Sequence, residues 1–321
     1  MKPWPALAAL LVSCCLHAEP YSFAAFGDTP YDDEERAVIP GMLKEMGDSG
    51  ARFAVHIGDF KSATEPCSDE LYADRKQLFD TASLPVIFVP GENDWLSCQR
   101  RTTGKHEPDE RLQTLRDMFF SRAAMTAKTG LTIDQQGQVE FNFGANMEHL
   151  RWRIGPVLYV TLNVPGNSNN WGNGVIGSQE YQARMAAVRD WIEKSFTIAE
   201  RESLKGVVIF AHADPDFEAW AEDKPARGFG ELLGELRSAF DTYKGEVLFV
   251  HGDTHVMRSD RPFNDSDGQP MRRFRRVEVY GSPILGWVEL KVDPEGDRLF
   301  RIAIHPLRPE GGQFDQLTPI Q

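Results

Sequence analysis

Residues 85–94 have the sequence PVIFVPGEND, in which a short apolar stretch is followed by a glycine and three polar side chains. The apolar part, residues 85–89, has the length and the residue types of a buried strand. Glu92, Asn93 and Asp94 follow directly where that strand is expected to end. Similar combinations of an apolar strand and a polar residue recur along the chain, and this recurrence decides the predicted fold.

Four other predicted strands also end in side chains that bind metals. They are followed by Phe26-Gly27-Asp28, Ile57-Gly58-Asp59, Phe210-Ala211-His212 and His251-Gly252-Asp253-Thr254-His255. In open α/β sheets, ligands bind beyond the carboxyl ends of the strands. Carboxylates, an amide and imidazoles suit Mn, Fe, Zn or Mg, whereas a soft copper site would contain sulfur. One such fragment alone is usually a turn, but five in succession predict a metal site.

Apolar strands alternate with helical stretches, which indicates an α/β architecture. The expected strands cover residues 21–26, 52–57, 85–89, 139–143, 150–154, 157–162, 206–211, 246–250, 275–280, 286–292 and 298–304. The expected helices cover residues 34–46 (interrupted at Pro40-Gly41), 69–81, 107–120, 181–196 and 232–243. Residues 166–172 form a loop by composition, and the tail after Pro306 is expected to be loose. With no repeat or linker, residues 19–321 are expected to form one domain.

The first 18 residues have the features of an export signal. Lys2 gives a small positive charge, an apolar run begins at Ala6, and Ala18 suits signal peptidase cleavage. The run is too short to span a bilayer, and no later segment is long and apolar enough to do so. The alternatives are a buried N-terminal element, or cleavage before Cys14 to give a lipid-anchored protein. We therefore expect a periplasmic or secreted protein.

Removal of residues 1–18 leaves two cysteines, Cys67 and Cys98. An oxidising compartment favours a disulfide between them. This bond would join the loops after the second and third strands, and closing such a loop stabilises a protein by about 3–4 kcal/mol. A thiolate metal site is the alternative, although it would need closer ligand spacing.

The chain has a formal net charge of −13. A protein this acidic repels the phosphate backbone, so we expect no broad nucleic-acid binding. A local cationic pocket or bound metal ions can still supply positive charge. No Gly-x-Ser-x-Gly segment occurs, and both remaining cysteines are assigned to a disulfide, so nothing supports a Ser- or Cys-nucleophile hydrolase.

In this order, the strand ends resemble the motifs of the calcineurin-like metallophosphoesterase superfamily over most of the chain. The family motifs are Asp-x-His, Gly-Asp, Gly-Asn-His-Asp/Glu, a His, and Gly-His-x-His. The matching segments are Gly27-Asp28-Thr29-Pro30, Gly58-Asp59, Gly91-Glu92-Asn93-Asp94, His212 and Gly252-Asp253-Thr254-His255. The resemblance implies a four-layer α/β/β/α sandwich of two mixed sheets with a site for two divalent metal ions.

The sequence departs from the family pattern at four positions. Pro30 and Asp253 each replace a metal-binding histidine, Glu92 replaces a metal-binding asparagine, and Asn93 replaces the catalytic histidine. The site is therefore rich in oxygen ligands, which favours harder ions such as Mn or Mg. The segments Gly58-Asp59-Phe60-Lys61-Ser62 and Pro90-Gly91-Glu92-Asn93-Asp94-Trp95 resemble those of an atypical branch of the superfamily.

Carried over by position, the resemblance assigns two overlapping ligand sets. One ion would be bound by Asp28, Asp59 and His255, and the other by Asp59, Glu92, His212 and Asp253, with Asp59 bridging. Asn93 would hydrogen-bond the charge that develops in the transition state. His251 would orient a neighbouring ligand, or would be a packed strand histidine.

Asp94 and Lys61 are further candidate catalytic residues, because each lies within two residues of a predicted ligand. Arg100, Arg101 and Arg258 are candidate phosphate contacts or solvated surface residues. Residues 167–171 would overhang the site or form an ordinary surface loop.

The activity implied by the resemblance is metal-dependent hydrolysis of a phosphate ester in a small phosphorylated substrate, by a metal-activated hydroxide attacking phosphorus. The alternative is a degenerate metallophosphoesterase fold that acts as a non-catalytic binding module. This alternative is motivated by Pro30 and Asn93.

Overall fold

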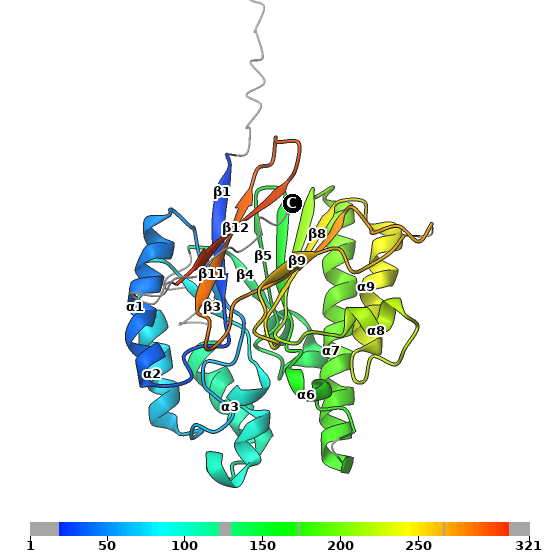
Figure 1. The fold of residues 1–321 in the computed structure, drawn as a ribbon. Coiled ribbons are helices and arrows are strands. Elements are labelled where there is room, and N and C mark those ends of the chain that lie inside the picture. Colours follow the sequence, from blue (N-terminus) through cyan, green and yellow to red (C-terminus); the bar gives the residue numbers. More distant parts are fainter. Residues whose placement is uncertain (1–18, 122–129, 173, 266, 308–321) are drawn as a thin grey trace, which may run out of the picture.

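The computed structural model describes residues 19–121, 130–172, 174–265 and 267–307. Two mixed β-sheets pack face to face, and helices cover both outer faces (Figure 1). The predicted α/β sandwich of two mixed sheets is therefore confirmed. The predicted signal segment, the lipid-attachment alternative at Cys14 and the tail from residue 308 lie outside the described residues.

The first sheet has the strand order β12-β11-β1-β2-β3. Its strands are β1 (Tyr21–Phe26), β2 (Ala54–His56), β3 (Val86–Phe88), β11 (Gly286–Val292) and β12 (Phe300–Pro306). β1, β2 and β3 are parallel, whereas β11 is antiparallel to both β1 and β12. The carboxyl ends of the three parallel strands, each followed by a predicted ligand, therefore meet at one edge.

The second sheet has the order β4-β5-β6-β7-β8-β10-β9. Its strands are β4 (Ile133–Gln135), β5 (Leu150–Ile154), β6 (Val157–Thr161), β7 (Gly206–Phe210), β8 (Glu246–His251), β9 (Arg258–Asp260) and β10 (Phe274–Glu278). β6, β7, β8 and β10 are parallel, and the pairs at both edges are antiparallel. The ligand-bearing ends of β7 and β8 are thus neighbours.

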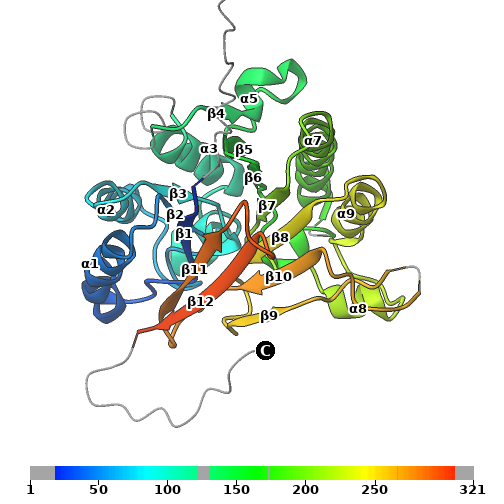
Figure 2. The same cartoon turned by 90° about the horizontal axis from the view of Figure 1, so that it is seen from above.

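Long helices form the two outer layers (Figure 2). α1 (Asp33–Asp48), α2 (Asp69–Asp80) and α3 (Pro108–Phe119) flank the first sheet, and α7 (Gly174–Arg201) and α9 (Gly230–Thr242) flank the second. Asp32 caps α1 by accepting a hydrogen bond from the Glu35 N–H. The short helices α5 (Gln136–Val139), α6 (Gly166–Asn169) and α8 (Phe217–Ala221) and the 3₁₀ turns η1 (Glu92–Asp94), η2 (Leu96–Gln99), η3 (Arg101–Thr103) and η4 (Phe141–Phe143) lie in the connections.

The central strands are apolar on both faces. On β7, Val208 and Phe210 pack between the two sheets, whereas Val207 and Ile209 pack on the side of α7 and α9. Such strands read as continuous apolar runs in the sequence, which is typical of parallel strands covered on both sides. Among the described residues, no helix has the length and apolar character that a bilayer crossing requires.

The expected strand at residues 139–143 is wrong. These residues form the end of α5 and the turn η4, and Phe141 is fully exposed. Apolar residues at alternate positions imitated a strand, but no neighbouring strand pairs with them in the described sheets. Two helices also differ from the prediction: α1 continues through Pro40, and α7 extends from Gly174 to Arg201 where a helix was expected over residues 181–196.

Candidate metal centre

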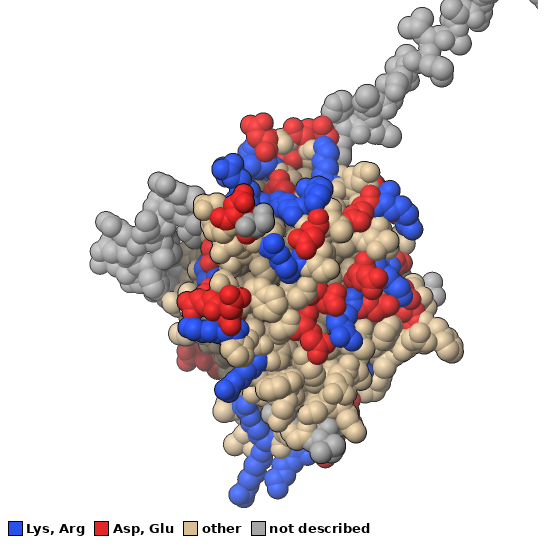
Figure 3. Space-filling model, turned by 90° about the vertical axis from the view of Figure 1, so that its right-hand side faces the viewer, with Lys and Arg blue, Asp and Glu red and all other residues tan. Residues whose placement is uncertain are grey.

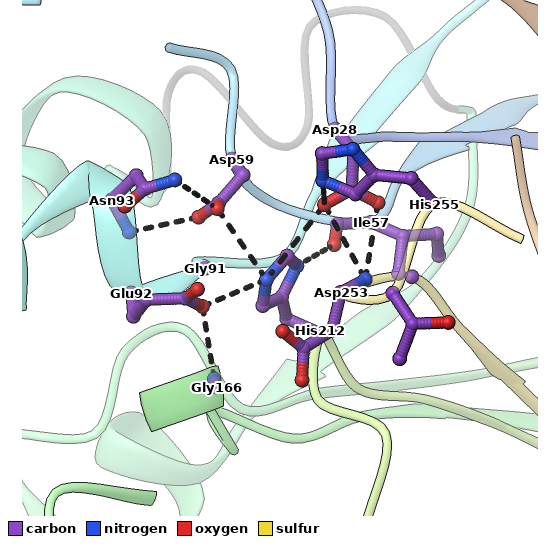
Figure 4. Close-up of polar contacts among 12 residues, drawn as sticks. Asp28, Ile57, Asp59, Gly91, Glu92, Asn93, Gly166, His212, Asp253 and His255 are labelled. Atoms are coloured by element: carbon purple, nitrogen blue, oxygen red, sulfur yellow. Dashed lines mark hydrogen bonds and ion pairs between the residues drawn. The ribbon is translucent and has the colours of Figure 1, made fainter. Parts of the chain in front are cut away.

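The six predicted metal ligands lie together where the ligand-bearing strands of both sheets end (Figure 4). His212 Nε2 lies 2.8 Å from Glu92 Oε2, 3.6 Å from Asp59 Oδ2 and 3.9 Å from Asp28 Oδ1. On the other side of Asp28, His255 Nε2 lies 3.5 Å from its Oδ1. Residues from five separate strand ends therefore converge on one small volume.

Two compact sets of ligand atoms can be distinguished within this cluster. Asp28, Asp59 and His212 form one set, and Glu92, His212 and Asp253 form the other, with the ligand atoms of each set within 4.8 Å of one another. His212 belongs to both sets but has a single ring nitrogen free for a metal, so it can serve only one ion. The division of the ligands between two ions remains a prediction.

Both histidines are oriented by backbone carbonyls. His212 Nδ1 lies 2.6 Å from the Ile57 carbonyl oxygen, and His255 Nδ1 lies 2.6 Å from that of Ser282. A carbonyl only accepts hydrogen bonds, so Nδ1 carries a hydrogen in each ring, and Nε2 is the nitrogen that faces the carboxylates. His212 Nε2 is buried and makes no hydrogen bond of acceptable geometry. These are the features of metal-ligating histidines, so the residues fit a cation at this position.

The concentration of carboxylates perturbs the acid–base properties of the cluster. Burial and the neighbouring Glu92 raise the pKa of Asp59 well above its usual value, and the same two causes raise the pKa of Asp253 to about 7. Burial by itself would lower the pKa of His212, but the charges of Asp59 and Glu92 raise it well above its usual value. A bound cation would offset this mutual repulsion of negative groups.

Glycines allow the backbone to approach the ligands closely. A Cβ atom added to Gly91 would lie 2.2 Å from Asp59 Oδ1, and one added to Gly252 would lie 2.2 Å from Asp28 Oδ2. Both distances are far below a van der Waals contact. Any larger residue at these positions would therefore displace a predicted ligand.

Four of the six predicted ligands have left-handed backbone conformations. The φ angles are 51° for Asp28, 53° for Asp59, 80° for Asp253 and 61° for His255. Residues other than glycine are uncommon in this region, although aspartate and histidine adopt it more often than most, and such residues concentrate at functional sites. Backbone hydrogen bonds from Asp28 N to Gly58 O and from Ser282 N to Asp28 O help to hold the turn.

Solved structures provide the clearest likeness to known proteins. No protein-family model matches the sequence, and no curated protein matches it significantly. A dimetal phosphatase from Danio rerio superposes with a TM-score of 0.55 at 13% identity, over 89% of this chain and 96% of that one. A purple acid phosphatase from yellow lupin seeds gives a TM-score of 0.50 at 15% identity, over 86% of this chain and 50% of that one, so the chain spans about half of the lupin protein.

The chain has the calcineurin-like metallophosphoesterase fold. Both of these matching proteins are named as phosphatases, and the candidate ligand sets suit divalent metals. At these identities the likeness concerns the fold, and the chemistry has to be argued from the residues of this chain.

In this metallophosphoesterase fold, Asn93 contacts the predicted bridging ligand. Its backbone N–H donates to Asp59 Oδ1 at 2.8 Å, and its amide nitrogen lies 2.5 Å from Asp59 Oδ2. Ser97 Oγ donates to the amide oxygen at 3.0 Å. Asn93 therefore orients Asp59, and both ends of its amide are already hydrogen-bonded.

Asp94 and Lys61 lie behind the ligand cluster. The Asp94 carboxylate is completely buried and accepts the backbone N–H groups of Asp59, Phe60 and Gly91 at 2.7–3.0 Å. Lys61 Nζ is also buried and donates to the carbonyls of Ser62 and Asn93. Both side chains thus connect the loops after β2 and β3. Because both are buried behind the ligands, neither faces the open side of the site, where a substrate would bind.

His251 packs at the end of β8. Its Nδ1 lies 2.9 Å from the Gly252 carbonyl, its Nε2 is buried without a hydrogen bond, and burial lowers its pKa well below the usual value. Among the hydrogen bonds of the described residues, none joins it to Asp253 or His255. No direct hydrogen bond therefore supports the prediction that His251 orients a neighbouring ligand.

The candidate phosphate contacts at the surface are only partly available. Arg258 forms ion pairs with Asp214, Glu218 and Glu278. Arg100 and Arg101 are exposed, and Arg100 donates to the Ala63 carbonyl at 3.4 Å.

Four groups at the site were missed by the sequence analysis. The Tyr31 hydroxyl lies 3.4 Å from Asp59 Oδ2 and 3.3 Å from His255 Nε2. The backbone N–H groups of Gly166 and Asp214 donate to Glu92 and Asp253. The buried Glu278 accepts hydrogen bonds from Thr254, Val256 and Arg258, and so holds the loop that carries the last two ligands. Glu278 was detectable as a carboxylate in the second half of a predicted strand, and Tyr31 as a neighbour of the first motif.

The predicted disulfide between Cys67 and Cys98 is confirmed. It joins the loop after β2 to η2, with Cα atoms 5.6 Å apart and a sequence separation of 31. Cys98 follows Asp94 closely in the chain, so the disulfide reinforces the same two loops that Asp94 and Lys61 connect.

Proposed function

We propose that the protein is a metal-dependent phosphoesterase that acts on small phosphorylated substrates. The observation that carries the proposal is His212 Nε2, which is buried and faces the carboxylates of Asp28, Asp59 and Glu92 without a hydrogen bond of acceptable geometry, although Glu92 Oε2 is only 2.8 Å away. Buried polar atoms are normally paired. These residues would hold a divalent cation, which would give Nε2 a partner and compensate the negative charge of the carboxylates.

The proposed ligands of one ion are Asp28, Asp59 and His255, and those of the other are Asp59, Glu92, His212 and Asp253. Divalent Mn, Fe, Zn or Mg, when bound, supplies positive charge for the phosphoryl oxygens and lowers the pKa of a coordinated water. The nearby cations Lys61 and Arg258 are already bonded within the protein. An anionic substrate would therefore depend on bound metal for attraction to this acidic cluster.

Tyr31 is the proposed hydrogen-bond donor to the substrate. Burial and the charge of Asp59 raise its pKa far above the usual value, so the hydroxyl keeps its hydrogen. It lies beside the half-exposed His255, on a side of the cluster that is partly open to solvent. Asn93 is less suited to this role, because its amide makes shorter hydrogen bonds, 2.5 Å to Asp59 and 3.0 Å to Ser97, than the contacts of 3.3 and 3.4 Å made by the Tyr31 hydroxyl.

The decisive experiment measures hydrolysis of p-nitrophenyl phosphate and bis-p-nitrophenyl phosphate with added Mn²⁺. We expect metal-dependent turnover of at least one ester, and a loss of about a thousandfold or more in Asp59→Asn, because the site would lose a bridging ligand. Asp48→Asn on exposed α1 is the matched control and should behave as wild type. Equal, metal-independent rates in all three proteins would refute the proposal.

A non-catalytic binding module is the second candidate. Pro30 offers no ligand atom, and Asn93 is bonded to Asp59 instead of facing the open side. This candidate predicts Mn²⁺ binding that depends on Asp59 but no turnover of either ester. Calorimetric titration with Mn²⁺, done beside the activity assay, distinguishes the two functions.

We also propose that the protein is exported after removal of residues 1–18. The disulfide between Cys67 and Cys98 supports this, because such bonds persist in oxidising compartments. Fractionation of producing cells and the mass of the mature chain test the proposal. A mature chain that begins at Cys14 would indicate lipid attachment, and an uncleaved cytosolic chain would contradict export.

A further inference from the structure

A second polar site lies at the opposite end of the sheets. A pocket of about 790 Å³ is formed by the start of β8, the first half of β10 with the loop before it, and the β11–β12 hairpin. β8 starts at Glu246 in this pocket and ends at His251 next to the metal centre. The length of the strand therefore separates the pocket from the candidate active site.

Arginines dominate the lining of this pocket. The five arginines are Arg261, Arg272, Arg273, Arg275 and Arg298, and the acidic lining residues are Glu246 and Asp297. Figure 3 shows a face on which Lys and Arg side chains gather in the upper part, with acidic side chains among them. On a chain with a net charge of −13, this excess of positive charge is a local feature.

These guanidinium groups lack acidic partners. None of the five forms an ion pair with a described residue, whereas Arg258 and Arg276 near the metal centre each pair with several carboxylates. Arg273 donates to the carbonyls of Phe240 and Tyr243, and Arg261 donates to the Arg272 carbonyl. Carbonyls satisfy donors but do not neutralise the positive charge.

Arg275 identifies the part of the pocket where an acceptor is missing. On β10 it is two residues before Val277, which packs between the sheets, and it lines the pocket with Leu248 and Phe300. Its Nε is closed off from solvent and makes no hydrogen bond. Burial, together with the charges of Arg261 and Arg298, lowers its pKa. A buried donor without an acceptor is costly, and an anion in the pocket would remove both penalties.

We propose that this pocket binds a compact polyanion that carries several phosphate groups. A guanidinium offers a planar fork of donors that matches two phosphate oxygens, which favours arginine for such ligands. The arginines come from three separate segments, so a chain of phosphates engages them better than one phosphate does. The volume lies within the range of ordinary ligand pockets. The site is independent of the proposed hydrolysis, because it shares no residue with the metal centre.

The test uses the folded full-length protein freed of metal with EDTA, so that an acidic metal centre without cations does not bind the probe. Tripolyphosphate is titrated calorimetrically at low salt. We expect saturable binding to one site that weakens as salt is added. Arg272→Ala combined with Arg298→Ala should reduce the affinity about a hundredfold, or about tenfold for each lost guanidinium contact. Both residues are exposed, so the double variant should fold.

Lys44→Ala combined with Arg189→Ala is the matched control, because it removes the same charge from exposed positions on α1 and α7. It should bind tripolyphosphate with wild-type affinity, as should Asp59→Asn. Absence of saturable binding to wild type, or an equal loss in the two double variants, would overturn the proposal. Binding of citrate as tight as that of tripolyphosphate would overturn the assignment to phosphate chains, and loss of binding in Asp59→Asn would move the site to the metal centre.

Discussion

The two ends of the β-sandwich, which β8 connects, differ in the sign of their charge and in how their side chains are held. At the carboxyl ends, Asp28, Asp59 and His212 are buried, and hydrogen bonds from the surrounding loops hold the ligand side chains. At the opposite end, the arginines of the pocket are exposed or half-buried. The acidic end is therefore preorganised for a small cation, whereas the basic end can adapt to a larger anion.

This difference also explains how each end responds to its surroundings. Buried charges interact through a medium of low polarity and are little affected by salt, whereas exposed charges are screened. We expect metal binding to depend strongly on single ligands and on pH. Anion binding at the arginine pocket should depend on salt and on the number of arginines.

The largest expected effect is a difference in activity and metal content between variants of two strand-end histidines, His212 and His251. His212→Gln removes a ring nitrogen that faces three carboxylates, and we expect metal-dependent hydrolysis to fall about a thousandfold with a lower metal content per chain. His251→Gln changes a histidine that bonds the Gly252 carbonyl, and it should retain its metal. Elemental analysis and turnover of a phosphate ester measure both effects.

Each of these variants should bind tripolyphosphate as wild type does, because the arginine pocket lies at the other end of β7 and β8. A change in anion affinity in His212→Gln would contradict the independence of the two ends. Equal metal loss in the two histidine variants would restore the predicted orienting role of His251.

A second prediction concerns Asp94, whose carboxylate accepts three backbone N–H groups from the loops after β2 and β3. Asp94→Asn has one acceptor oxygen in place of two and adds donors, so we expect the free energy of unfolding to fall by about 2–3 kcal/mol. Denaturant unfolding of the metal-free protein measures this change. If Asp94 takes part in the chemistry instead, turnover per folded molecule will fall by orders of magnitude while stability stays near that of wild type.

The pH dependence of stability should also differ between metal-free and metal-loaded protein. Asp59 and Asp253 have raised pKa values, about 7 for Asp253, so the folded metal-free protein binds protons more tightly than the unfolded chain. This contribution destabilises the folded state as pH rises through about 7 and is relieved as pH falls toward about 4. The raised pKa of His212 acts in the same direction.

Bound Mn²⁺ reverses this trend at the acidic end, because protons compete with the ion for the same ligands. The difference in melting temperature between Mn²⁺-loaded and EDTA-treated protein should therefore grow from about pH 5.5 to about pH 8. Asp253→Asn should flatten the dependence. An identical pH profile with and without Mn²⁺ would contradict this account.

The fold and the positions of the predicted ligands were predictable because they are encoded locally. Each ligand directly follows an apolar strand, and parallel strands bring their carboxyl ends together without further information. The disulfide was predictable because only two cysteines remain after residue 18, and the fold places them in the loops after two neighbouring strands. A short alternation of apolar and polar residues predicted strands less reliably. Residues 139–143 have this pattern, but no strand of the described sheets lies beside them to pair with.

The remaining features depend on contacts between distant segments. Gly166 donates its backbone N–H to Glu92, and a Cβ at this position would lie 2.6 Å from Glu92 Oε2, but only the folded chain brings the two residues together. The arginines of the pocket come from three segments, and only the folded chain brings them together. Asp94 and Lys61 were predicted to be catalytic because they neighbour the ligands in sequence. In the fold both side chains are buried and bonded to the backbone, and their catalytic role stays a prediction.

The smallest expected effect tests Tyr31, the side chain that lies across the two ligands Asp59 and His255. Tyr31→Phe keeps the ring packed edge-on against His255 and removes only the hydroxyl. If the hydroxyl donates to the substrate in the transition state, kcat should fall about tenfold with metal content unchanged, since one hydrogen bond of this kind contributes about 1–2 kcal/mol.

Tyr72→Phe is the matched control, because Tyr72 is a buried tyrosine of the same half of the molecule whose hydroxyl donates to the Asp94 carbonyl, behind the cluster. It should lower stability and leave kcat per folded molecule near that of wild type. Tyr31→Phe could instead lower the metal content while the rate of the metal-loaded fraction stays unchanged. In that case the hydroxyl acts on the ion and its ligands, and Tyr31 is not the hydrogen-bond donor to the substrate.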